Sequence, residues 1–88
     1  MKNTLTKKEY DEITEWVNCA LSAPNKKSAS KYLSLLKSKT LYVSGAVRNV
    51  LGELWASTGA ASGQVDDKGR KESFCRMDLF KLESFVEK

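Results

Sequence analysis

Apolar residues recur at steps of three and four along most of this chain, and that period restricts it to helical folds. Over residues 6–21 the apolar stripe consists of Tyr10, Ile13, Val17, Ala20 and Leu21. Such spacing places the apolar side chains on one face of an α-helix, where they must pack against another element. The pattern therefore predicts an all-α protein.

The first predicted helix has signals at both of its ends. Thr6 and Glu9 fit a capping box, in which the hydroxyl and the carboxylate each bond to an otherwise unpaired backbone amide. Leu5 and Tyr10 flank this box and fit a hydrophobic staple. Downstream, Pro24 stops the helix because it cannot donate to the hydrogen-bond ladder and restricts the residue before it. We therefore expect a helix over residues 6–21.

Two further stripes predict helices over residues 28–37 and 44–57, with Ser44 as the N-cap of the second. Their buried positions are expected to be Ala29, Tyr32, Leu33 and Leu36, and then Ala46, Val47, Val50, Leu51 and Leu54. Between the two stripes, residues 40–43 are β-branched or aromatic and favour a short extended connector.

The last third of the chain allows two interpretations. Residues 58–71 hold three glycines and little apolar content, which predicts a long loop. The residues that follow predict a continuous helix over 72–87, because its apolar side chains share one helical face: Phe74, Cys75, Leu79, Leu82, Phe85 and Val86. In the alternative, Asp78 caps a shorter helix and residues 64–76 form a β-hairpin. With the continuous helix, residues 1–88 are expected to form a single-domain bundle of about four helices; in the alternative, a short β-hairpin replaces part of the last helix.

Several classes of function conflict with the residue inventory. The chain has no histidine, which excludes serine and cysteine hydrolases with a histidine base and zinc sites that use histidine. Asp66 and Asp67 lack the further oxygen ligands that a calcium loop needs. Two cysteines are too few for a disulfide scaffold, and we expect Cys19 to be exposed and Cys75 to be buried. We therefore expect no enzyme, with no catalytic residue, metal or cofactor.

The hydropathy pattern gives an expectation of location. No apolar run reaches the roughly 18–20 residues that span a bilayer, and the first residues lead into no signal-peptide core. We expect a cytoplasmic protein that has no membrane partner.

Positive charge is concentrated in the middle of the chain. The whole chain holds 15 basic and 11 acidic residues, a net charge of +4, whereas residues 23–58 hold six basic residues against one acidic residue. A local excess of this kind attracts polyanions, nucleic acid first among them, although a solvated lysine face is the plain alternative. Four aromatic residues interleave with this region and could stack bases or fill the core: Trp16, Tyr32, Tyr42 and Trp55.

Residues 43–54 (VSGAVRNVLGEL) resemble the recognition-helix segment of helix-turn-helix and winged-helix DNA-binding proteins. In those families a capping serine opens the helix and exposed polar residues reach the groove. The resemblance implies a helix-turn-helix-like core in which Ser44, Arg48 and Asn49 face DNA. In the winged-helix alternative, a hairpin at 64–76 would carry Lys68, Arg70 and Lys71 to phosphate.

Two hypotheses of function remain open. The first is a small nucleic-acid-binding regulator that contacts DNA through Lys26, Lys27, Lys31 and the third helix. The second is a protein-binding adaptor or inhibitor, a bacterial or phage-type accessory protein that acts through helix–helix contacts. Its contact face would be the small side chains of Gly45, Gly52 and Ala56. A homodimer is compatible with both hypotheses.

Overall fold

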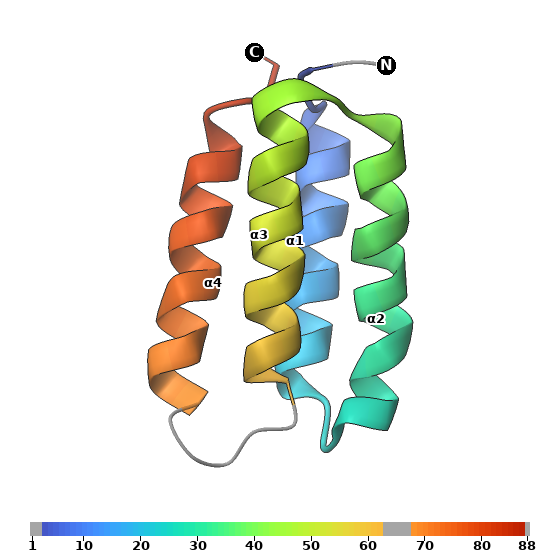
Figure 1. Cartoon of the computed structure of the whole chain (residues 1–88), viewed down its shortest axis with the longest axis vertical. Helices are drawn as coiled ribbons and strands as arrows, with labels where there is room; N and C mark the ends of the chain where they lie inside the picture. Colours follow the sequence, from blue (N-terminus) through green and yellow to red (C-terminus); the bar gives the residue numbers. More distant parts are fainter. Residues whose placement is uncertain (1–2, 63–67, 88) are drawn as a thin grey trace.

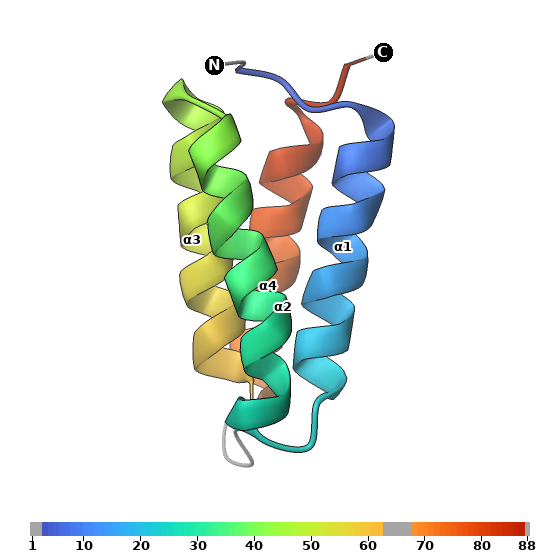
Figure 2. The same cartoon turned by 90° about the vertical axis from the view of Figure 1, so that its right-hand side faces the viewer.

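The described part of the chain forms four α-helices, which confirms the all-α prediction (Figures 1 and 2). A computed structural model describes residues 3–62 and 68–87, with side chains from residue 72 onward in the second range. The helices are α1 (Lys7–Ser22), α2 (Lys26–Lys39), α3 (Gly45–Ala61) and α4 (Lys68–Glu83), and a short 3-10 turn (Thr40–Tyr42) follows α2. Successive helices run in opposite directions along one long axis. Over these residues, no helix is long and apolar enough to cross a membrane.

The start of α1 confirms the capping box. Thr6 Oγ1 accepts a hydrogen bond from the Glu9 amide at 3.1 Å, and Glu9 Oε1 accepts one from the Thr6 amide at 3.0 Å. Leu5 is buried and Tyr10 is half-buried beside the core. The helix ends where Ala23, the residue before the proline, adopts an extended backbone conformation.

The bounds of α2 differ from the prediction at both ends. The helix begins at Lys26 because Asn25 is a good N-cap, and its Oδ1 accepts a hydrogen bond from the Ser28 amide at 2.8 Å. It continues to Lys39, and the extended connector predicted for 40–43 is wrong for its first three residues, which form the 3-10 turn. Val43 alone is extended, and it is fully buried in the core.

The long loop predicted over 58–71 is also wrong. Thr58 and Ala61 continue α3 and are fully buried, because the contact with α4 extends beyond the apolar stripe seen in the sequence. Ser62 ends α3, and its Oγ donates to the Thr58 carbonyl at 2.6 Å. Since α4 begins at Lys68, only residues between 62 and 68 are left to connect the two helices.

The continuous last helix is confirmed in place of the hairpin, because residues 68–76 are helical; residues 64–67 lie outside the described part. Its bounds are 68–83 and not 72–87. Asp78 is not an N-cap: it lies inside α4, is 7% exposed, and accepts a hydrogen bond from Ser57 Oγ at 2.9 Å. Phe74 was placed in the core by the sequence pattern, but 49% of it is exposed. Cys75, Leu79 and Leu82 define the buried face of α4, and Phe74 lies at the edge of that face, where its side chain is exposed.

The core runs the length of the bundle. The closest packing joins α3 to α4 and α1 to α2, and α2 does not contact α4 over the described residues. The core cluster consists of these side chains: Leu5, Ile13, Val17, Leu21, Leu36, Val43, Val47, Leu51, Leu54, Ala61, Cys75, Leu79 and Leu82. Ala46, expected to be buried, is exposed at the start of α3.

The two ends of the chain meet at Leu5. The Leu5 amide donates to the Phe85 carbonyl at 3.0 Å, and the Leu5 carbonyl accepts from the Glu87 amide at 2.7 Å. These bonds form an isolated parallel bridge between Leu5 and Val86. The segment before α1 is therefore fixed against the segment after α4.

The arrangement of α2 and α3 departs from a helix-turn-helix. That motif crosses its two helices at about 90–120°. Here α2 and α3 run side by side in opposite directions in both views. The connector also includes the 3-10 turn and Val43, which together reverse the direction of the chain.

Replacing Leu5 with alanine should destabilise the protein by about 2–5 kcal/mol, because Leu5 is fully buried and its removal leaves a cavity between the chain ends. Urea unfolding followed by circular dichroism measures this change. Leu41→Ala is the matched control, since Leu41 is 60% exposed and its loss should cost less than about 0.5 kcal/mol. Equal effects of the two variants would contradict the role of Leu5.

Candidate nucleic-acid interface

Helix α2 carries the largest net positive charge of the four described helices. It carries five lysines and no acidic residue. Ala29 and Leu36 face the core, so the helical period leaves Lys26, Lys27, Lys31 and Lys37 exposed. Arg48, in the first turn of α3, is exposed beside the end of α2. We call these five residues the cationic surface: Lys26, Lys27, Lys31, Lys37 and Arg48.

Lys39, the fifth lysine of α2, has a structural role. Its Nζ lies 3.2 Å from Glu9 Oε2, and both side chains are largely buried, with 19% and 16% of their areas exposed. Glu9 also caps α1, so this ion pair joins the end of α2 to the start of α1. Lys39 is therefore not part of the cationic surface.

Lys26 connects α2 to the far end of α3. Its Nζ donates a hydrogen bond to the Gly59 carbonyl at 3.0 Å. Gly59 lies in the last turn of α3, where carbonyl groups lack helical partners and a positive charge is favourable. Lys26 remains exposed. It can contact a ligand either while bonded to Gly59 or after this hydrogen bond breaks.

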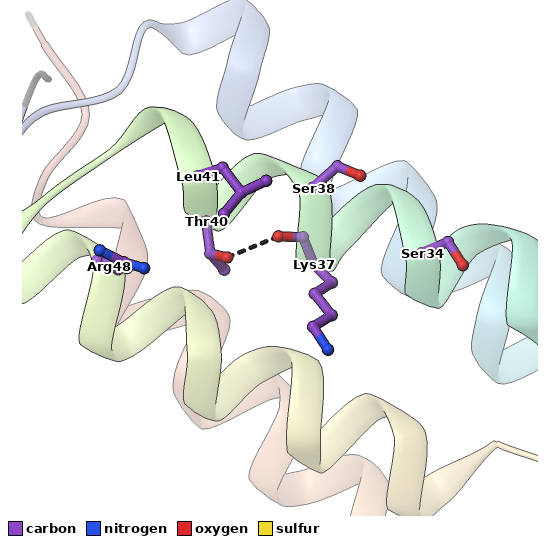
Figure 3. A pocket seen from close by; sticks show the side chains of 6 residues that line it. All are labelled: Ser34, Lys37, Ser38, Thr40, Leu41 and Arg48. Atoms are coloured by element: carbon purple, nitrogen blue, oxygen red, sulfur yellow. Dashed lines mark hydrogen bonds between the residues drawn. The ribbon is translucent and has the colours of Figure 1, made fainter.

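A hollow of about 420 Å³ lies at the other end of the cationic surface. Figure 3 shows Lys37 extending from α2 toward α3, with Arg48 nearer the start of α3, on the other side of Thr40. The remaining lining residues are Ser34, Ser38, Thr40 and Leu41. Thr40 Oγ1 donates to the Lys37 carbonyl at 2.6 Å, which fixes the turn that forms one wall. None of these lining residues is acidic, and a guanidinium, an ammonium and hydroxyl groups suit a phosphate.

Aromatic side chains take different positions around the cationic surface. Lys37 Nζ lies 5.1 Å from the centre of the Trp55 ring, a cation–π contact between α2 and α3. Trp16 and Trp55 pack against the core and are half-buried, as is Tyr32, whose ring centre lies 5.8 Å from Lys31 Nζ. Tyr42 is 67% exposed on the 3-10 turn. Its exposure makes Tyr42 the best placed of the four for base stacking.

The structure brings only some of the predicted contact residues together. Arg48 and Asn49 are neighbours and both exposed, but Arg48 alone lines the hollow. Ser44 holds the N-cap position by its extended backbone, yet its hydroxyl makes no capping hydrogen bond. The capping role predicted for the Ser44 side chain is therefore wrong.

The prediction that a hairpin carries three basic residues to phosphate is also wrong. Lys68, Arg70 and Lys71 lie in the first turns of α4 and not on a hairpin, and their side chains lie outside the description. The start of α4 is at the opposite end of the bundle from the start of α3, which carries Arg48. These three residues therefore do not extend the hollow between α2 and α3.

The small-residue face of α3 is open. Gly45 and Ala56 are exposed and Gly52 is partly exposed. A Cβ added at Gly45 or Gly52 would have no atom of another described segment within 4 Å. This face is therefore not used for packing within the described chain.

Of the residues that form the hollow, only Arg48 was predicted from the sequence as a contact residue. Lys37 entered the charge count but was placed at the last position of its helix, followed by an extended connector. Because α2 continues and then turns, Ser34, Lys37 and Ser38 lie on the same outward side as the turn. The cap at Asn25 and the local hydroxyl bond of Thr40 were the available signals for these helix bounds.

Metal-ligating and nucleophilic side chains are dispersed among the described residues. These residues contain no group of three or more metal-ligating side chains, and Asp66 and Asp67 lie outside them. Cys75 is buried as predicted, whereas Cys19 is half-buried and not exposed; both are free thiols. Burial raises the pKa of the Cys75 thiol, which lowers its thiolate fraction and its reactivity.

Comparisons with family models, curated proteins and solved structures find no match to this chain.

The two glycines of the small-residue face should respond in opposite ways to alanine. Gly52→Ala should stabilise the protein by about 0.5–1 kcal/mol, because Gly52 lies in open space within α3. Gly45→Ala should destabilise it by about 1–2 kcal/mol, because Gly45 has a φ of +65°. Paired urea denaturation curves measure both changes. Destabilisation by Gly52→Ala would show that this side of α3 is packed and not open.

Proposed function

We propose that this chain is a small non-enzymatic nucleic-acid-binding regulator that holds the phosphate backbone on the cationic surface. One observation carries the proposal: four exposed lysines of α2 and Arg48 of α3 gather on adjacent helices, and α2 carries no acidic residue. An ordinary solvated helix carries acidic residues among its lysines, as α1 does. The excess on α2 therefore favours an anionic ligand.

The length of the cationic surface suits several phosphates. The 14 residues of α2 extend about 21 Å, along which duplex DNA presents about a dozen phosphates. The cationic surface supplies five positive side chains over this length. Four or five such contacts give a slope of about −4 in the logarithm of affinity against the logarithm of salt concentration.

The hollow between α2 and α3 provides the most specific position for one phosphate. Arg48 can donate two parallel hydrogen bonds to phosphate oxygens, and Lys37 supplies a second charge from the facing helix. Asn49 adjoins this position and has the donor and acceptor pair that matches the edge of adenine. Contacts to the backbone would position the nucleic acid, and Asn49 would add a modest preference for sequence.

If the cationic surface binds nucleic acid, the position of the removed charges should matter more than the change in net charge. In the triple variant Lys27→Gln, Lys31→Gln, Arg48→Gln, affinity at ~0.1 M salt should fall roughly 10²-fold or more, and the salt slope by about three. Fluorescence anisotropy with labelled duplex and single-stranded DNA measures both quantities. Asn49→Ala should alter the ranking of sequences more than the salt slope.

The control removes three exposed lysines from other helices: Lys7→Gln, Lys8→Gln, Lys81→Gln. Both triple variants lower the net charge by the same amount, so the control should retain most of the affinity. Equal losses in the two variants would mean that net charge alone attracts the DNA. Absence of binding by the wild type at low salt would reject the proposal.

A protein-binding adaptor or inhibitor is the second candidate, favoured by the open face of α3. Close helix packing needs small side chains at the contact, and Gly45, Gly52 and Ala56 supply them. The absence of any neighbour within 4 Å of an added Cβ at Gly52 means that this surface is accessible to another chain.

The second candidate predicts that Gly52→Leu abolishes complex formation and keeps the helical signal and the unfolding midpoint. The reason is that a Cβ at this position has no atom of another described segment within 4 Å, whereas a leucine side chain would hold a partner helix away. Affinity capture quantified by mass spectrometry, with Gly52→Ala as the smaller control, measures the loss of any specific partner. A partner retained equally by all three proteins would place the interface elsewhere.

A further inference from the structure

Helix α4 exposes large apolar side chains that the bundle does not use. Phe74 is 49% exposed, Met77 is 55% exposed and Phe80 is 76% exposed. They recur every three residues, so they form one stripe along the outer side of α4, which we call the α4 stripe. The opposite side of the same helix packs Cys75, Leu79 and Leu82 into the core. A helix that is apolar on both sides has a second surface to bury.

The α4 stripe is separate from the cationic surface. α2 and α4 make no contact over the described residues, and α3 and α1 lie between them (Figures 1 and 2). A ligand on α2 therefore leaves the outer side of α4 uncovered. The inference that follows does not depend on the proposed function.

We propose that the α4 stripe binds a second copy of this chain through antiparallel α4 helices. The stripe is symmetric about Met77, with one phenylalanine three residues before it and one three residues after it. With a two-fold axis at Met77, Met77 of one copy lies opposite Met77 of the other. Phe74 of one copy then lies opposite Phe80 of the other. This is the self-complementarity that a two-fold interface requires.

The surface around Phe80 combines a protruding side chain with adjacent hollows, as a helix–helix contact requires. Phe80 lines a hollow of about 260 Å³ with Tyr10, Thr14, Arg76, Leu79 and Glu83. It also lines a second hollow of about 310 Å³ with Glu83 and Ser84. The first hollow lies between α1 and α4 and the second at the end of α4, so a protruding aromatic ring and adjacent hollows occur together, as two packed copies need.

Charge favours this side of the molecule for self-association. Among the described residues 72–83, the charges outside the core balance: Arg76 and Lys81 against Glu72 and Glu83. The cationic surface, in contrast, would repel its own copy. Two copies can therefore bring residues 72–83 together with little like-charge repulsion. Over residues 72–83, a strongly acidic or strongly basic partner would find no matching charge excess.

The size of the contact predicts a weak dimer. One helix face from each copy buries less than the roughly 1,200 Å² of a standard stable interface. The chain should therefore exchange between monomer and dimer, with a dissociation constant in the micromolar to millimolar range. The dimer would carry two cationic surfaces, each on a side of its subunit that the contact does not cover.

Sedimentation equilibrium from about 10 µM to about 1 mM tests the proposal. The average mass should rise from 9.8 kDa toward twice that value. Phe80→Glu should raise the dissociation constant by about 30-fold or more and keep the unfolding midpoint, because Phe80 is largely exposed. Tyr42→Glu is the matched control: Tyr42 is an aromatic residue with 67% exposure away from α4, and its variant should associate like the wild type.

A cross-link tests the geometry independently. In a Cys19→Ser background, Met77→Cys should form a disulfide-linked dimer on mild oxidation, because the two-fold axis places the two cysteines opposite each other. Lys31→Cys in the same background is the control and should not form this dimer. A wild type that stays monomeric to about 1 mM would overturn the proposal and leave the stripe to a partner other than this chain. Association that Phe80→Glu leaves unchanged, or equal cross-linking at both positions, would also overturn it.

Discussion

The apolar contact between α3 and α4 is the interaction on which the rest of the structure depends. It is the most extensive helix pair, and it continues into the last turn of α3, where Thr58 and Ala61 are fully buried. It also contains a carboxylate, Asp78, which is tolerated because Ser57 donates a hydrogen bond to it. This contact fixes the rotation of both helices. It thereby determines which side of α3 meets α2 and which side of α4 faces solvent.

The functional proposals concern the surfaces that this packing leaves exposed. Because α3 uses Leu51 and Leu54 for the core, Arg48 is turned toward the end of α2. The hollow that Arg48 forms with Lys37 is therefore a consequence of core packing combined with the turn at Thr40. On α4, burial of Asp78 and Leu79 leaves Phe74, Met77 and Phe80 outside. Binding and self-association would use opposite sides of one small core, so a dimer could bind a polyanion at two places and gain affinity by avidity.

Tertiary contacts engage two lysines of α2 and leave the other lysines of this helix available to bind a ligand. Lys39 pairs with Glu9 at the end where α1 starts, and Lys26 bonds to the last turn of α3. These contacts hold α2 against both of its neighbours. Lys27, Lys31 and Lys37 make no ion pair among the described residues, and they are the lysines on which the nucleic-acid proposal chiefly depends.

The sequence by itself determined the helical class, the capping box at Thr6, the stop at Pro24 and the positive charge of the middle segment, because each depends on residues close together in the chain. Only the tertiary structure decided that α3 continues to Ala61, since the burial of Thr58 and Ala61 extends the helix beyond its local apolar pattern. It also decided that Lys39 is paired and that Phe74 is exposed. These outcomes depend on the rotation of each helix against its neighbours. A periodicity of three and four residues shows which side chains share a helical face, but it does not show which residues of another helix that face contacts.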